Sequence, residues 1–192
     1  MNKDFELTDE QSLRDLQSYL SRAKRLDPDG LVRLRAYGNV LAAYVAPLFS
    51  GSVLDGGLTV IGLRTTELAA EAEVDRLVSI SSVLDRLARV LESSTTDYRV
   101  EVPEAGQRAA WAGISPPRSG WVAGGVIDEA ELTALARAGI QEVADTLPAS
   151  VGGPIAARIR QEIWGRGIEQ DTRIPTGAAF VAAGLGFMTE KE

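Results

Sequence analysis

The 192-residue chain contains no cysteine and no histidine. Without cysteine it has no disulfide, no thiolate nucleophile and no zinc–thiolate site. Without histidine it lacks the usual general base near neutral pH, so neither a Ser-His-Asp triad nor a Cys-His pair can form. Catalysis would have to use Asp, Glu, Arg, Lys, Tyr or Ser, and a bound metal would be an oxygen-ligated ion. We therefore expect neither a cofactor nor a metal site.

The phosphate-binding and serine-hydrolase motifs are also missing. The sequence has no G-x-x-x-x-G-K-[ST], no G-x-G-x-x-G and no G-x-S-x-G. The glycine pair in VAGGV (122–126) leads toward a helix start at Asp128, where the carboxylates of Asp128 and Glu129 oppose a bound anion. A nucleotide-binding enzyme or a serine hydrolase is not expected.

Long apolar runs and excess positive charge are lacking too. No window approaches 18 consecutive apolar residues, and the first residues, MNKDFELTDEQ, lack the apolar stretch of a signal peptide. The net charge of −7 repels a phosphate backbone. We expect a cytoplasmic protein that does not bind membranes and whose charge disfavours nucleic acid.

The first half of the chain shows one helix followed by β structure. Thr8 and Gln11 form a capping-box pattern before a helix over 9–24. DPDG (27–30) is a turn, and Gly38-Asn39 indicates a two-residue hairpin turn within 31–48. Further strands are expected at 57–69 and 75–80, then a helix over 83–92 capped by Ser82 and a short strand over 98–102.

The predicted hairpin has two different faces. Pairing across Gly38-Asn39 sets Tyr37 opposite Val40, Arg35 opposite Ala42 and Arg33 opposite Tyr44. The other face is entirely apolar and consists of Val32, Leu34, Ala36, Leu41, Ala43 and Val45. We expect the apolar face to belong to the core.

Beyond residue 103 the patterns are helical. Asp128 caps an expected helix over 129–147, and Pro154 begins a second at the position where its missing N–H matters least. TGAAFVAAGLGFM, capped by Thr176, indicates a last helix to about residue 188. Because residues 174–189 carry no charge, this helix is either buried or shared with a second copy of the chain.

Strands followed by helices favour the α+β class. We expect an N-terminal helix, an antiparallel sheet of about four strands and a helical C-terminal half. The expected parts are 1–103, a Pro- and Trp-containing connector over 104–127, and 128–192 packed on the sheet as one domain.

Three tryptophans mark the first candidate binding site. Each of Trp111, Trp121 and Trp164 has small residues beside it, which lets the ring lie against backbone. They either anchor the connector into a core or wall a pocket, with Arg118 or Arg166 supplying a positive charge. In the first case WAGISPPRSGW (111–121) is a stiff strap whose two tryptophans are buried.

A second candidate is the Arg-Tyr face of the predicted hairpin. Arg33, Arg35, Tyr37 and Tyr44 form either a surface that binds an anionic ligand or an ordinary solvated sheet face. The anion-binding hypothesis predicts an affinity that falls with salt.

Four stretches resemble one group of proteins: WAGISPPRSGW, ARAGIQEVAD, EIWGRG and IPTGAAFVAAGLGFM. The chain resembles an uncharacterised family of bacterial proteins from GC-rich genomes. The resemblance brings no activity and no catalytic residue with it.

These observations favour a non-enzymatic binding protein, a homodimer with a protein or small-molecule partner. Two alternatives stay open. One is an enzyme that acts on a small anionic metabolite through Arg118 or Arg166 and a carboxylate. The other is a weak anion or nucleic-acid binder that uses Arg33 and Arg35.

Overall fold

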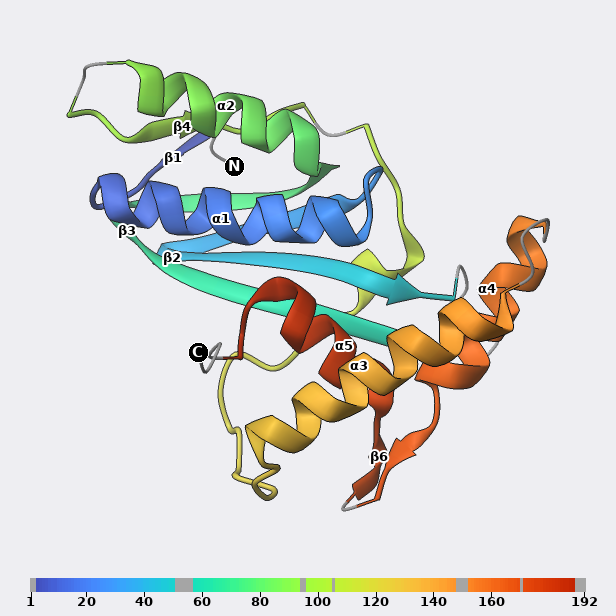
Figure 1. Ribbon diagram of the computed structural model, residues 1–192. Helices are drawn as coiled ribbons and strands as arrows, with labels where there is room; N and C mark the ends of the chain where they lie inside the picture. Colours follow the sequence, from blue (N-terminus) through green and yellow to red (C-terminus); the bar gives the residue numbers. More distant parts are fainter. Residues whose placement is uncertain are drawn as a thin grey trace. The chain divides into compact units, whose positions relative to one another are not determined.

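The computed structural model describes residues 3–50, 57–93, 96–104, 106–147, 152–169 and 171–188. The chain divides into two compact units. The first unit comprises 1–47 and 61–112, and the second comprises 48–60 and 113–192. Each unit contains both helices and strands, so the predicted α+β class is confirmed (Figure 1).

The expected four-stranded sheet is replaced by two-stranded pairs, of which the described residues form three. The longest joins β2 (Leu31–Phe49) to β3 (Thr59–Ser79). The others join β1 (Asp4–Glu6) to β4 (Arg99–Glu101), and β5 (Gly167–Ile168) to β6 (Asp171–Pro175). The sequence predicted four shorter strands over the residues of β2 and β3, whereas the structure has these two long strands.

The turn predicted at Gly38-Asn39 lies inside β2. Gly38 has φ of 60°, the left-handed conformation that glycine adopts readily, and Figure 1 shows β2 turning back near its middle. The buried positions change there from even to odd numbers, as pairing across a two-residue turn requires. The apolar face is buried as expected, and its residues are Val32, Leu34, Ala36, Leu41, Ala43 and Val45.

Helix α1 (Glu10–Leu26) supplies an apolar side that packs within the first unit. Its buried residues are Leu13, Leu16, Tyr19, Leu20 and Ala23, at helical spacing.

The cap of α1 differs from the prediction. The expected Thr8 cap is wrong, because the side chain of Asp9 accepts the hydrogen bond from Ser12 N at 2.7 Å. The Thr8 hydroxyl lies 3.0 Å from that of Ser12 instead. The backbone hydrogen bond stabilises the ionised carboxylate and so lowers the pKa of Asp9.

Helix α2 (Ile80–Glu92) follows β3 directly. The predicted cap at Ser82 is wrong, because Ser79 holds the cap position and makes no side-chain hydrogen bond there. The first-turn N–H of Ile80 instead donates to the carbonyl of Gly30 at 3.1 Å, just before β2 begins. The Gly30 carbonyl thus satisfies the Ile80 N–H, a first-turn donor that has no partner within the helix. The helix can therefore start earlier than the serine pattern indicates.

Strand β1 was not predicted from the sequence, whereas β4 lies within the short strand expected over 98–102. Phe5 pairs with Val100 in the antiparallel β1–β4 pair, and both side chains are buried. Arg99 forms an ion pair with Glu6, at 2.7 Å, on the same two strands. A three-residue strand shows too little alternation to be recognised without its partner.

The second unit contains the helices α3 (Glu129–Thr146), α4 (Gly153–Trp164) and α5 (Thr176–Leu185). The predicted cap of α3 is confirmed, since the Asp128 side chain accepts a hydrogen bond from Ala130 N at 2.7 Å. Helix α5 ends at Gly186, whose φ of 73° is the left-handed conformation common after a helix.

The start of α5 differs from the prediction. Thr176 does not cap the helix, because its hydroxyl donates to the carbonyl of Ile163 at 3.2 Å and Pro175 holds the cap position. Among the described residues, none of the helices combines the length and the apolar character that a membrane crossing needs.

Candidate functional site

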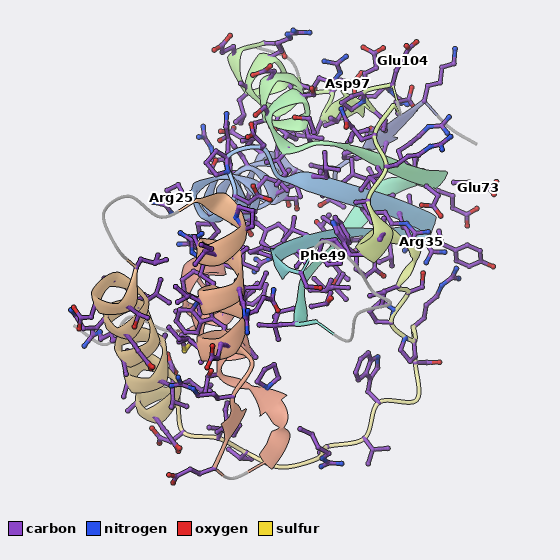
Figure 2. All side chains as sticks on the ribbon, turned by 90° about the vertical axis from the view of Figure 1, so that its right-hand side faces the viewer. Arg25, Arg35, Phe49, Glu73, Asp97 and Glu104 are labelled. Carbon is purple, nitrogen blue, oxygen red and sulfur yellow. The ribbon has the colours of Figure 1, made fainter. Side chains whose placement is uncertain are left out.

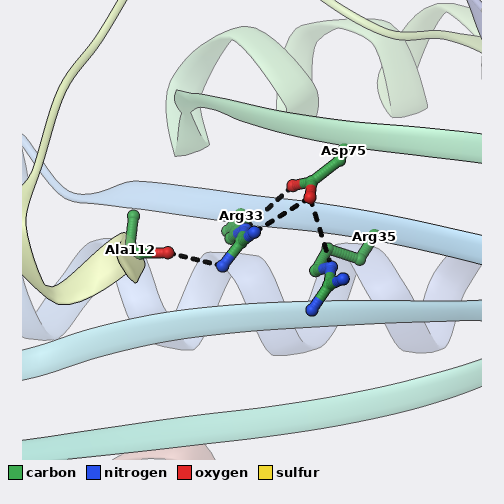
Figure 3. Close-up of polar contacts among 4 residues, drawn as sticks. All are labelled: Arg33, Arg35, Asp75 and Ala112. Carbon is green, nitrogen blue, oxygen red and sulfur yellow. Dashed lines mark hydrogen bonds and ion pairs between the residues drawn. The ribbon is translucent and has the colours of Figure 1, made fainter. Parts of the chain in front are cut away.

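A polar cluster in the first unit is built on β2 and β3 (Figure 3). Arg33 makes a two-point contact with Asp75, with Nε 2.8 Å from Oδ1 and Nη2 2.9 Å from Oδ2. Arg35 reaches the same carboxylate, with Nε 3.3 Å from Oδ2. Two guanidinium groups therefore share one carboxylate, and the three side chains together carry one net positive charge.

The alternation of a strand explains why both arginines meet Asp75. Arg33 and Arg35 are two residues apart on β2, so their side chains leave the same face. Figure 2 shows Arg35 and Glu73 on the same side of the molecule, and Glu73 is two residues from Asp75 on β3. Two cations of β2 thus meet the Asp75 carboxylate of β3.

Charge and hydrogen bonding shift the pKa values of this cluster. The hydrogen bonds from Arg33 lower the pKa of Asp75, and the charges of Arg33, Arg35 and Arg76 act in the same direction. The hydrogen bond to Asp75 raises the pKa of Arg33. Asp75 stays ionised at neutral pH and partly neutralises the two arginines, which weakens the case for an anion site here.

Arg33 also holds a segment that is distant in sequence. Its Nη1 donates to the carbonyl of Ala112, which lies in the short 3-10 helix η1 (Ala110–Gly113). Trp111, the preceding residue, is only 5% exposed. One arginine therefore fastens this turn to the β2–β3 pair within the first unit.

The two tyrosines predicted for this face differ in environment. Tyr44 is buried. Tyr37 is 71% exposed. The four residues of the predicted face therefore do not form one uniform surface.

Trp111 lies against a small cavity of the first unit. The cavity has a volume of about 20 Å³ and is lined by Trp111 together with residues that include Ala23, Gly30 and Ile80. A space of this size has room for little more than one water molecule. Trp111 is thus buried beside a cavity too small for a ligand.

Trp164 is an anchor of the second unit. It is 3% exposed, and its ring stacks on Phe180 of α5. A methyl group at Gly139 of α3 would lie 2.2 Å from the Trp164 ring, so the absence of a side chain at this glycine is what lets the ring approach α3. The ring fills the space between three helices.

The other predicted ligand residues of the second unit lie at its surface. Arg166 is paired with Glu142, with Nη1 2.8 Å from Oε2. Arg118 is exposed, and Trp121 is 71% exposed. The expectation that both tryptophans of WAGISPPRSGW are buried is therefore wrong for Trp121.

The Trp121 side chain is held in place although it is exposed. Its Nε1 donates to the carbonyl of Pro117 at 3.0 Å, and Gly120 between them has φ of 80°. Residues 117–121 thus form a closed loop that presents the indole ring. Exposed Val122 and Val126 follow in a stretch without regular secondary structure.

Sequence reasoning missed Asp75, Gln161 and Gly177. Each of them matters through a partner far away in the chain. The partners are Arg33 for Asp75, Leu58 for Gln161, and Leu48 and Leu58 for Gly177. No local pattern marks these residues, because the spacing of apolar residues reports which face is buried but not which distant group meets it.

Two family models match the chain. DUF8010, a domain of unknown function, matches residues 1–113, and DUF8185, also a domain of unknown function, matches residues 116–192. The chain belongs to the DUF8010 family. No curated protein and no solved structure matches it. The two matches to domains of unknown function confirm the predicted resemblance to an uncharacterised family.

The two matches meet inside WAGISPPRSGW. The DUF8010 match contains the Arg33–Asp75–Arg35 cluster and Trp111. The DUF8185 match contains the other four predicted ligand residues, which are Arg118, Trp121, Trp164 and Arg166. The residues of the first candidate site are thus divided between two matches and between the two units.

Proposed function

We propose that this DUF8010 protein is a non-enzymatic binding protein that forms a homodimer, and that the contact includes residues 121–126. The observation that carries the proposal is the exposure of three large apolar side chains in this short stretch. Trp121 is 71% exposed, Val122 89% and Val126 96%. Neighbouring exposed apolar groups of this kind are typical of contact surfaces.

The geometry of Trp121 suits it to be an anchor in such a contact. Its only polar side-chain group already donates to Pro117, so burial of the ring leaves no unsatisfied donor. Burying the exposed part of the ring contributes on the order of 3 kcal/mol. The closed loop around Gly120 also limits the conformational entropy lost on binding.

A second copy is the partner that we propose, and the connector carries the contact in place of α5. Helix α5 has its apolar residues Ala179, Val181 and Leu185 buried within the second unit. This burial supports internal packing as the reason for its lack of charge. The segment 121–126 has no charged residue, so two copies meet there without like-charge repulsion.

Sedimentation velocity of the full chain tests the proposal. We expect a dimer at micromolar concentration, and a monomer for the double variant Trp121→Ser with Val122→Ser. Val40→Ser is the matched control, because Val40 is also an exposed valine but lies in the first unit. It should leave the dimer intact.

A monomeric wild-type chain across this concentration range would contradict the dimer. A dimer that survives the double variant would show that the contact lies elsewhere.

A further inference from the structure

Gly177, near the start of α5, packs against the end of β2 and the residue before β3. A methyl group at Gly177 would lie 2.8 Å from Cδ1 of Leu48, 3.1 Å from Cδ2 of Leu58 and 3.1 Å from the carbonyl oxygen of Trp164. Only a residue without a side chain allows two leucines to approach this α4–α5 corner so closely.

A hydrogen bond supports the same contact from α4. The side-chain oxygen Oε1 of Gln161 accepts from Leu58 N at 2.8 Å, in a part-buried position. The backbone N–H of Leu58 is thus satisfied by a side chain of the helix. Because the Gln161 oxygen accepts from this one backbone N–H, the hydrogen bond fixes Leu58 opposite Gln161.

Residues 48–50 and 57–60, which we call the β2–β3 flank, belong to the DUF8010 match by sequence. They nevertheless cluster with residues 113–192 as part of the second unit. All the contacts just described lie within that unit. The helices of the DUF8185 match therefore contact a piece of chain that the DUF8010 match supplies.

We propose that the α4–α5 corner is a binding site for the β2–β3 flank, and that this contact holds the two family modules together without the connector. The ligand of the site is a pair of extended segments with a leucine on each and a backbone N–H directed at Gln161. The connector then serves as a tether that raises the effective concentration of the two parts. This inference does not depend on the proposed dimer.

Cleavage of the folded full-length protein tests this proposal. A specific protease site is inserted between Pro117 and Arg118, in the exposed loop, and the purified protein is cut there. Native mass spectrometry then reports whether the fragments stay together. We expect the cut wild-type chain to remain a complex that contains the two fragments in equal numbers.

Variants on both sides of the contact should separate the cut fragments. On the flank, Leu58→Asp places a charge against the α4–α5 corner; on the helices, Gly177→Val fills the space that both leucines use. Gln161→Ala should raise the dissociation constant roughly two- to tenfold, the effect of one lost hydrogen bond.

Matched controls keep the test decisive. Gly153→Val makes the same change in α4, where the added Cβ meets no described atom within 4 Å apart from its chain neighbours and its own helix backbone. Gln141→Ala removes an exposed glutamine of α3. Both should leave the cut complex intact. Far-UV circular dichroism of each uncut variant shows that the helices are folded. Separation of the cut wild-type fragments, or a Leu58→Asp complex as tight as the wild type, would overturn the proposal.

Discussion

Trp164 stacks on Phe180, with ring centroids 4.7 Å apart and ring planes inclined by 25°. The two residues come from α4 and α5, and the indole ring also lies over Gly139 of α3. One ring therefore joins the three helices of the second unit.

Gly139→Ala should destabilise the second unit. Alanine raises helix propensity by about 1 kcal/mol over glycine, but the new methyl group would lie 2.2 Å from the Trp164 ring. Overpacking of this kind costs about 1–3 kcal/mol, so we expect the clash to dominate. Urea unfolding followed by far-UV circular dichroism measures the change.

Gly153→Ala is the control for that variant. Its Cβ meets no described atom within 4 Å beyond its chain neighbours and helix backbone, so it should leave the stability unchanged or slightly raised. Equal stabilities of Gly139→Ala and Gly153→Ala would show that the ring does not lie where the structure places it.

Asp75→Asn should lower the melting temperature at neutral pH and have a smaller effect in acid. The pKa of Asp75 is lowered in the folded state, so the stability that its charge contributes is present above the ordinary value of 3.8. That contribution is lost as the pH falls through the lower folded-state pKa. The difference in melting temperature between the variant and the wild type should therefore narrow as the pH falls from 7 to 3.

Asp29→Asn, at an exposed position, is the comparison for Asp75→Asn. A gap between Asp75→Asn and the wild type that stays constant down to pH 3 would argue against the ion pair as its cause.

Asp9→Ala should lower the melting temperature more than Thr8→Ala does. Asp9 accepts the capping hydrogen bond from Ser12 N, whereas Thr8 contacts the Ser12 hydroxyl. Differential scanning calorimetry of the two variants compares them directly. A larger loss of melting temperature for Thr8→Ala than for Asp9→Ala would instead support Thr8 as the capping residue.

Trp121 should dominate acrylamide quenching of the tryptophan fluorescence in dilute protein. It is largely exposed, whereas Trp111 and Trp164 are 5% and 3% exposed. Trp121→Phe should remove most of the readily quenched signal. If the proposed dimer forms through residues 121–126, the quenching of the wild type should also fall as its concentration rises.

Local patterns in the sequence determined much of the secondary structure. The Asp128 cap and the bounds of α3 were predicted almost residue for residue, because a cap and a helical repeat are satisfied by neighbours within one turn. The apolar face of β2 was predicted for the same reason, since alternation is a local property of extended chain.

Tertiary structure decided which side chains meet. Arg33 and Asp75 are 42 residues apart, and Leu58 and Gln161 are 103 apart, so no local repeat connects them. It also decided that Trp111 and Trp164 are buried and Trp121 is exposed. The three tryptophans have similar small neighbours in sequence, but burial depends on which distant surfaces close around a ring, and only the folded chain supplies those surfaces.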